Sequence, residues 1–282
     1  MKLFRYGEIG AEKPGIIDAD GGLRDLSSQV SDIDGVILSP ENLKKLAAID
    51  PASLPLVPAG TRIGPCVGSI SKIVAIGLNY SDHAEEAGMP VPTEPIIFMK
   101  ATSAICGPDD DVIKPVGSTQ LDYEVELGIV IGVKANYVSE EAALDYVAGY
   151  CIVNDVSERS YQVGRPGGQW DKGKGCDTFA PVGPWMVTTD EIPDPQILDL
   201  ELDVNGEKRQ RGSTAKMVFN VRQLVSDVSN YMTLLPGDII ITGTPPGVGM
   251  GMKPPVYLEP GDEMRLAISG LGEQHQNVIA YR

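Results

Sequence analysis

Three acidic residues stand at alternate positions inside one of the most apolar segments of this chain, and few folds accommodate that pattern. Asp122, Glu124 and Glu126 lie within residues 121–133, which read L-D-Y-E-V-E-L-G-I-V-I-G-V. Alternate residues of a β-strand share one face, so the segment predicts a strand that aims up to three carboxylates the same way. Because the segment is rich in β-forming apolar residues, we expect it to lie inside the fold.

Carboxylates that face inward need compensation. Burying one without a partner is costly, and the usual remedies are protonation, a basic partner or a cation. We therefore interpret the strand as one wall of a divalent-metal site. An amphipathic strand that keeps its acidic face in water is the alternative that this segment alone leaves open.

A third carboxylate ligand has to come from elsewhere, and Asp155 is the best candidate. It follows the apolar residues 150–153 in G-Y-C-I-V-N-D-V-S-E-R, where a strand opens into a loop, so a neighbouring strand end would bring it to Glu124 and Glu126. Two Glu and one Asp favour a hard cation, with Mg²⁺ first and Mn²⁺ or Ca²⁺ next. The alternative for Asp155 is the cap of a helix that starts near residue 157.

Composition excludes several classes of partner. The 282 residues carry a net charge of −16, so nucleic acid and anionic membranes are not expected partners. Hydrophobic runs fall short of the roughly 20 residues of a membrane span, and the first residues, M-K-L-F-R-Y-G-E, lack the apolar stretch of a signal peptide. The four cysteines are widely spaced, which argues against zinc and a disulfide framework and favours the reducing cytoplasm.

The first part of the chain, residues 1–70, reads as a small separate α+β domain. Residues 1–6 and 15–18 predict short strands, and residues 40–49 predict a helix that Ser39 caps. Four prolines between positions 51 and 65 then indicate a linker. We place the boundary near residue 70, so that residues 71–282 form the catalytic, metal-binding domain.

From residue 71 onward β signals dominate, and the few helices follow no β-α-β rhythm. Asn205-Gly206 indicates a hairpin turn between two strands. The pattern predicts a mostly β, mixed-sheet roll with peripheral helices, an α+β fold. Strands are expected at residues 72–77, 95–100, 123–133, 150–155, 184–188, 200–204, 238–242 and 263–268, and helices just after residue 79 and at 140–147 and 221–232.

Residues 77–88, G-L-N-Y-S-D-H-A-E-E-A-G, predict a short polar helix with Asn79 or Ser81 as its cap. On this helix His83 and Glu86 are three residues apart and share a face. A carboxylate that orients an imidazole makes a competent base near neutral pH, and a marginal helix of this kind suits a lid. An exposed surface helix is the alternative. The second histidine, His275, lies in a polar run and is expected at the surface.

Two further segments carry candidate pocket residues. Residues 159–174 form a Gly-rich stretch with cations and amides in an otherwise acidic chain, which suits a substrate that bears a carboxylate. Residues 239–251 form a strand that runs into a glycine–proline loop, whose N–H groups and Thr244 suit a carboxylate as well. Solvated lysines and a structural turn are the respective alternatives. The candidates in the first segment are Arg159, Gln162, Arg165, Lys172 and Lys174.

The order of these motifs resembles the fumarylacetoacetate hydrolase family. The motifs are N-Y-S-D-H-A-E-E, D-Y-E-V-E-L-G-I-V-I-G, V-N-D-V-S-E-R, K-G-K-G-C-D-T-F-A-P-V-G-P-W and T-G-T-P-P-G-V-G, and the likeness covers residues 71–282. It implies the family's mixed β-roll, a Mg²⁺ or Mn²⁺ ion and a homodimer.

The resemblance also implies a role for each matching residue. Metal ligands would be Glu124, Glu126 and Asp155, without Asp122. His83 and Glu86 match the family's water-activating pair on a mobile lid. Lys174 matches the lysine at the keto-acid end of the substrate, with Arg159, Gln162 and Thr244 as further pocket residues.

The small N-terminal unit and the loop around Trp170 look like the longer bacterial members of the family. The implied reaction is hydrolysis of the C3–C4 bond of a 2,4-diketo acid to pyruvate and a carboxylic acid. The substrate would be an acylpyruvate or a 2,4-diketo-3-deoxy sugar acid such as the fuconate or rhamnonate derivative. The rivals are oxaloacetate decarboxylation and a non-catalytic carboxylate-binding protein of the same fold.

Overall fold

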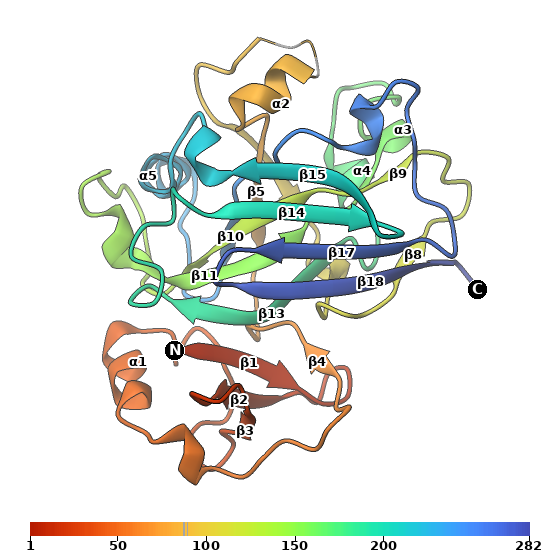
Figure 1. The fold of residues 1–282 in the computed structure, drawn as a ribbon. Helices are drawn as coiled ribbons and strands as arrows, with labels where there is room; N and C mark the ends of the chain where they lie inside the picture. The colour runs from red at the N-terminus through yellow and green to blue at the C-terminus, as the bar shows by residue number, and fades with distance from the viewer. Residues whose placement is uncertain (87, 89) are drawn as a thin grey trace.

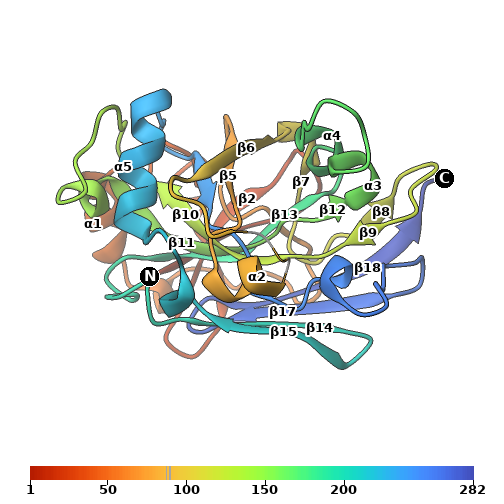
Figure 2. The same ribbon diagram turned by 90° about the horizontal axis from the view of Figure 1, so that it is seen from above.

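Two large β-sheets pack against each other and helices lie at their periphery. The computed structural model of the chain describes residues 1–86, 88 and 90–282, without the side chains of residues 83 and 84. The smaller sheet lies in front of the larger one in Figure 1, and Figure 2 shows the two layers from above. The mostly β, mixed-sheet roll with peripheral helices that the sequence predicts is confirmed.

The larger sheet combines strands from the N-terminal part of the chain with strands from residues 71–282. Its strand order is β3 (Leu23–Asp25), β2 (Lys13–Ile17), β1 (Lys2–Tyr6), β13 (Ala180–Thr188), β11 (Val147–Asn154), β10 (Val125–Ile131), β16 (Ile239–Ile241), β5 (Ile73–Gly77) and β6 (Ile96–Lys100), while β4 (Ile63–Gly64) pairs with β1 and β7 (Ile105–Cys106) pairs with β13.

The smaller sheet has four antiparallel strands, built from two hairpins, and one parallel strand at its edge. Its order is β15 (Glu207–Ser213), β14 (Asp199–Val204), β17 (Glu263–Ile268), β18 (Gly272–Ala280) and β8 (Val112–Lys114), and a separate short pair joins β9 (Leu121–Asp122) to β12 (Ser157–Glu158). The turn between β14 and β15 is the expected hairpin, since Asn205 and Gly206 both have positive φ, 52° and 76°.

The helices are short and peripheral. Ser39 caps the first by accepting a hydrogen bond from the Asn42 N–H, as predicted, and Asn220 and Gln223 form a capping box at the start of the longest. The helices are α1 (Pro40–Ala47), α2 (Ser81–Glu86), α3 (Arg159–Gln162), α4 (Asp171–Lys174) and α5 (Val221–Tyr231), with 3₁₀ turns η1 (Pro51–Ser53), η2 (Thr102–Ala104), η3 (Ala143–Tyr146), η4 (Thr214–Lys216) and η5 (Gly249–Gly251).

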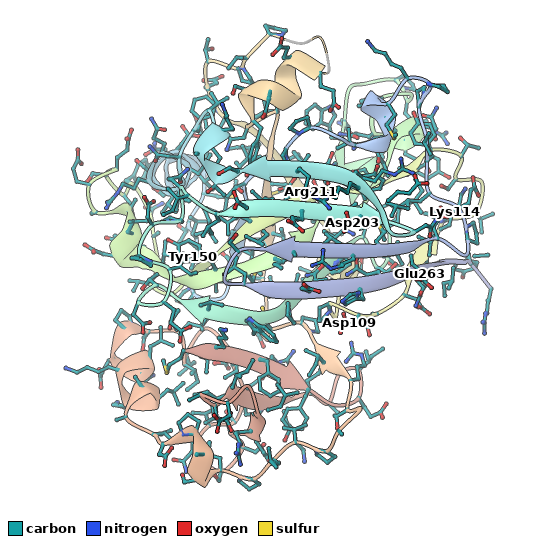
Figure 3. The ribbon with its side chains drawn as sticks, in the orientation of Figure 1. Asp109, Lys114, Tyr150, Asp203, Arg211 and Glu263 are labelled. Carbon is teal, nitrogen blue, oxygen red and sulfur yellow. The ribbon has the colours of Figure 1, made fainter. Side chains whose placement is uncertain are left out.

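The core lies around β10 and β11, because every residue of both strands is buried. Both sheet faces are covered there, which explains why these strands read as continuous apolar runs rather than alternating ones. In β14, by contrast, buried and more exposed residues alternate. Its outward-facing Asp203 forms an ion pair with Arg211 of β15, and both lie on the front of the molecule in Figure 3.

Buried glutamines join the two sheets. The β11–β13 pairing shifts register between Tyr150 and Ile152, and Ile152 lies opposite Gly183 beside this shift. The Gln274 side chain of β18 donates to the carbonyls of both residues, at 3.0 and 2.9 Å. A buried carbonyl needs a hydrogen-bond donor, and the Gln274 amide supplies one to the Ile152 and Gly183 carbonyls.

The N-terminal residues, which contribute β1–β4 to the larger sheet, lie at the bottom of the molecule in Figure 1. Strand β1 pairs with β13, with Leu3 opposite Met186, so the larger sheet extends from the N-terminal part into the rest of the chain. The division into two domains near residue 70 stays a prediction.

The structure corrects two sequence expectations about secondary structure. The strand expected at residues 123–133 is present but shorter, because β10 spans Val125–Ile131 and the residues before it form the separate strand β9, which ends at Asp122. The helix expected at residues 140–147 is only the turn η3, since β11 begins at Val147 and leaves too few residues for a helix. The His275 side chain is exposed as expected, at 62%, and the polar run around it forms strand β18, which was not among the expected strands.

The four cysteines are all free. Within the part of the chain that the structure describes, no helix combines the length and the apolar character that crossing a bilayer requires.

We expect Gln274→Leu to destabilise the protein by about 2–4 kcal/mol, because two buried carbonyls would lose their donor. Urea denaturation followed by circular dichroism measures the free energy of unfolding. His275→Leu is the matched control on the same strand, facing solvent, and should stay within about 0.5 kcal/mol of the parent. Equal stability of the two variants would contradict the bridging role.

Candidate active site

Strand pairing brings the predicted ligands together. Val125, the first residue of β10, lies opposite Asn154, the last residue of β11. The Asp155 N–H donates to the Glu124 carbonyl at 2.9 Å, so these two residues are fixed side by side. Together with Glu126 they offer three carboxylate oxygens within 4.8 Å of one another, and all three residues are buried. The convergence expected from neighbouring strand ends is confirmed.

Asp122 does not share this cluster, so the expectation of three carboxylates aimed the same way from one strand is wrong. Its carboxylate accepts hydrogen bonds from the Gly249 N–H at 2.7 Å and the Met250 N–H at 3.0 Å, and it pairs with Arg159 at 2.8 Å. The strand breaks between β9 and β10, which pair with different partners. Asp122 therefore anchors the glycine–proline loop.

The alternative role of Asp155 as a helix cap is also wrong. Helix α3 begins at Arg159, and the side chain that caps it belongs to Glu158. The Asp155 carboxylate instead faces two lysines, Lys174 and Lys100.

Two cations from the predicted Gly-rich segment reach into the cluster, because α3 and α4 fold over it. The Lys174 ammonium donates to Glu124 at 2.7 Å and to Asp155 at 2.6 Å. The Arg159 guanidinium contacts Glu124 at 2.7 Å and donates to the Gln162 amide oxygen at 2.9 Å. Burial lowers the pKa of Lys174, but the attraction of Asp155 and Glu124 outweighs burial, so its pKa is raised and it stays charged.

Lys100, at the end of β6, is a site residue that the sequence reading missed. Its buried ammonium lies 2.6 Å from the second carboxylate oxygen of Asp155 and donates to the Val156 carbonyl at 2.9 Å. Burial lowers its pKa despite the neighbouring carboxylate. The available signal was a single lysine that closes the apolar run I-I-F-M-K, where a charged group needs a buried partner.

Glu126 is the carboxylate with the least compensation. Its described hydrogen bond comes from the Gly243 N–H at 2.8 Å. Burial, followed by repulsion from Asp155 and Glu124, raises its pKa well above the ordinary value. A dication beside the three oxygens would reverse this repulsion, and an all-oxygen donor set suits Mg²⁺ or Mn²⁺. The residues present therefore fit such an ion.

A pocket opens beside the cluster. Its polar lining includes Glu124, Glu126, Arg159, Gln162, Lys174 and Thr244, so the structure brings these predicted residues together. The Thr244 hydroxyl donates to the Val125 carbonyl at 2.9 Å and accepts from the Gln210 amide at 2.7 Å. Arg165 and Lys172 do not line the pocket.

Helix α2 stands at the top of the molecule in Figure 1 and carries the predicted lid residues. The exposed Glu86 carboxylate accepts from the Gly247 N–H, at 3.0 and 3.1 Å, which docks the helix on the glycine–proline loop. Asn79 is not the helix cap, because its amide donates to the Phe219 and Thr242 carbonyls at 3.0 and 2.8 Å. The His83 side chain lies outside the described residues, so the His83–Glu86 pair stays a prediction.

The structure is a β-roll with a buried acidic cluster beside a pocket. Comparison with known proteins identifies the family to which this fold and site belong. Residues 72–279 match the fumarylacetoacetate (FAA) hydrolase C-terminal family, so the chain belongs to that family. A Burkholderia multivorans protein, provisionally named a hydrolase, is 62% identical over 283 residues that cover all of both chains.

Solved structures similar over the full length of both chains carry several activities in their titles. Fumarylacetoacetate hydrolase from Exiguobacterium antarcticum has a TM-score of 0.86 and 36% identity. Maleylpyruvate hydrolase from Sphingobium sp. SYK-6, described in complex with manganese(II) and pyruvate, has a TM-score of 0.83 and 30% identity. A 5-carboxymethyl-2-hydroxymuconate delta-isomerase from Mycobacterium smegmatis has a TM-score of 0.78 and 33% identity.

The raised pKa of Glu126 predicts a pH-dependent effect of Glu126→Gln in protein kept in chelator. A carboxyl whose pKa is higher in the folded state than its unfolded value of 4.5 costs stability once the pH exceeds that value. We therefore expect the variant to be more stable than the parent at pH 7, by at least about 1 kcal/mol, and equal to it well below pH 4.5.

Urea denaturation at several pH values provides the measurement. Glu140→Gln, at an exposed carboxylate, is the control and should change little at any pH. A parent that is more stable than Glu126→Gln at pH 7 in chelator would contradict the assignment of Glu126 as the uncompensated group.

Proposed function

We propose that this chain is a Mg²⁺- or Mn²⁺-dependent hydrolase that cleaves the C3–C4 bond of a 2,4-diketo acid to give pyruvate and a carboxylic acid. The observation that supports it is the buried group of Glu124, Glu126 and Asp155 beside the Lys174 ammonium and next to a pocket. Helix α2 docks through Glu86 on the glycine–proline loop that lines part of this pocket. Oxygen ligands, a fixed cation and a cover are the parts that such a reaction requires.

In this proposal Glu124, Glu126 and Asp155 hold the ion. When bound, the ion supplies Lewis-acid polarisation of the substrate's carboxylate and neighbouring 2-oxo oxygen. Lys174, with its ammonium between two of the ligands, adds positive charge where the pyruvate enolate develops. Arg159, Gln162 and Thr244 shape the pocket around the keto-acid end.

His83 is the proposed base, and Glu86 orients it. His83 takes a proton from water as the water oxygen bonds to C4 of the substrate. The C3–C4 bond then breaks, its electron pair forms the pyruvate enolate, and the enolate takes up a proton at C3. The docking of Glu86 on Gly247 gives this step a defined closed state, because the carboxylate that orients the base is then held on the loop beside the pocket.

Two related reactions use the same enolate chemistry and are the rivals. Oxaloacetate decarboxylation releases carbon dioxide, and isomerisation moves a double bond without releasing pyruvate. A non-catalytic carboxylate-binding protein would convert none of these substrates. Product analysis separates hydrolysis, decarboxylation, isomerisation and mere binding, since only hydrolysis yields pyruvate and a second carboxylic acid in equal amounts.

We also propose that the chain acts in the cytoplasm as a homodimer, on a small-molecule keto acid and without nucleic acid or membrane as partner. The resemblance to the family supports the dimer, and the net charge of −16 supports the absence of polyanionic partners. Sedimentation equilibrium at micromolar concentration tests the dimer directly.

Ion binding should stabilise the folded protein. We expect Mg²⁺ or Mn²⁺ at about 100 times its dissociation constant to add about 2.7 kcal/mol to the free energy of unfolding. Asp155→Asn and Glu124→Gln should lose most of this gain, because each removes a proposed ligand. Asp122→Asn is the matched control, a buried acid outside the cluster, and should keep the gain even if its own stability is lower.

Turnover should depend on both the ion and the lid. With acetylpyruvate and Mg²⁺ we expect loss of the diketone absorbance with equal yields of pyruvate and acetate, and no reaction in chelator. His83→Ala should lower kcat at least about 100-fold, because it removes the proposed base, and should leave the ion-induced stabilisation unchanged. His275→Ala, at the exposed histidine, is the control. A His83→Ala enzyme as fast as the parent would refute the water-activating role.

A further inference from the structure

The part of the pocket wall that lies beyond the acidic cluster is apolar, and its chemistry indicates which substrates fit. Five different parts of the chain contribute to it. Its members are Ile76 and Leu78 at the end of β5, Phe98 of β6, Val163 after α3, Trp170 before α4 and Met250 of the glycine–proline loop.

An aromatic pair starts this wall directly beside the proposed reaction centre. The Lys174 ammonium, which contacts Glu124 and Asp155, lies 5.1 Å from the centre of the Phe98 ring. The Phe98 and Trp170 rings meet edge to face, with their centres 5.3 Å apart. The wall therefore continues outward from the point where the keto-acid end would be held.

Gly77 makes room for this arrangement. A Cβ atom at residue 77 would lie 2.4 Å from the Trp170 ring, closer than real contacts allow. The indole is thus packed on the bare backbone of β5, which keeps it at the side of the pocket. Val163, which is 55% exposed, extends the wall to the mouth.

The two basic side chains of the pocket, Arg159 and Lys174, are already engaged by neighbouring side chains near the acidic cluster. Arg159 bonds to Asp122, Glu124 and Gln162, and Lys174 bonds to Glu124 and Asp155. Among the residues whose side chains the structure describes, Arg159 and Lys174 are the basic residues that line the pocket. A second carboxylate on the substrate would meet the apolar wall without a cation of its own.

We infer that the proposed substrate carries an apolar or aromatic acyl group at C4, so that the enzyme prefers aliphatic and aromatic acylpyruvates to dicarboxylic diketo acids and to polyhydroxylated sugar acids. This inference rests on the proposed function and specifies its substrate class. It places the acyl chain along Phe98 and Trp170 and its far end near Val163. Each methylene added within the wall should raise kcat/KM about fourfold until the chain reaches solvent.

A matched pair of ligands that are not cleaved tests the wall independently of catalysis. 2-Oxohexanoate and 2-oxoadipate share a six-carbon 2-oxo acid chain, and only the second ends in a carboxylate. The chain has two tryptophans, so Trp185→Phe leaves Trp170 as the single fluorescent reporter. With Mg²⁺ present, we expect 2-oxohexanoate to change Trp170 fluorescence and to bind at least tenfold more tightly than 2-oxoadipate. Equal affinities, tighter 2-oxoadipate binding or no response to 2-oxohexanoate would overturn the inference.

Turnover of a substrate series gives the second test. Acetylpyruvate, hexanoylpyruvate and benzoylpyruvate probe the apolar wall, and fumarylpyruvate carries the second carboxylate. Hexanoylpyruvate and benzoylpyruvate should exceed fumarylpyruvate in kcat/KM at least tenfold. Trp170→Ala should remove most of the advantage of the longer acyl chain, which is measured as the ratio of kcat/KM for hexanoylpyruvate to kcat/KM for acetylpyruvate in the variant and in the parent.

A variant that adds a positive charge at the mouth of the pocket tests the substrate preference of the wall separately from the proposed reaction. Val163→Lys puts a cation at the mouth and should raise kcat/KM for fumarylpyruvate relative to hexanoylpyruvate at least fivefold, whereas Tyr137→Lys, at an exposed position away from the pocket, should not. If acetylpyruvate is cleaved and fumarylpyruvate is the better substrate, the inference fails and the proposed reaction stands. If no diketo acid is cleaved but 2-oxohexanoate is still preferred, the reaction is wrong and the preference of the wall stands.

Discussion

The site depends on the pairing of β10 with β11, which ends by joining Glu124 and Asp155 through a backbone hydrogen bond. Both strands are buried along their whole length, so their ends can shift little without disturbing the core. Carboxylates that would repel one another in a flexible loop are thereby held close by the same contacts that hold the sheets together. Lys174, Arg159 and Lys100 then contribute the opposite charge that makes this burial tolerable.

The glycine–proline loop connects the acidic cluster to helix α2. Asp122 fixes the loop through the Gly249 and Met250 N–H groups, while the Gly247 N–H on the same loop receives Glu86 of α2. The same short loop therefore contacts both Asp122, next to the acidic cluster, and Glu86 of helix α2. Helix α2 has only six residues and gains much of its order from this docking, since a helix so short is unstable alone.

Sequence reasoning located the acidic cluster because a buried strand with charged residues is costly in any fold, and this cost is visible in composition and periodicity alone. It did not reveal that Asp122 belongs to a separate strand, because the break between β9 and β10 is set by partners far away in the chain, β12 and β16. Lys100 escaped notice for a similar reason: its carboxylate partner is more than fifty positions later. The glutamines of β18 look like surface residues until the irregular pairing of β11 with β13 shows which carbonyls they must satisfy.

The two lysines that flank Asp155 have a consequence for how the molecule is assembled. Ammonium groups already neutralise part of the acidic cluster in the folded chain, so the roll does not need a dication to overcome the repulsion among its carboxylates. Under the proposed function, the polypeptide can therefore reach its native shape before it binds the ion. In that case a shortage of metal would leave a folded protein without its ion rather than an unfolded chain exposed to proteolysis.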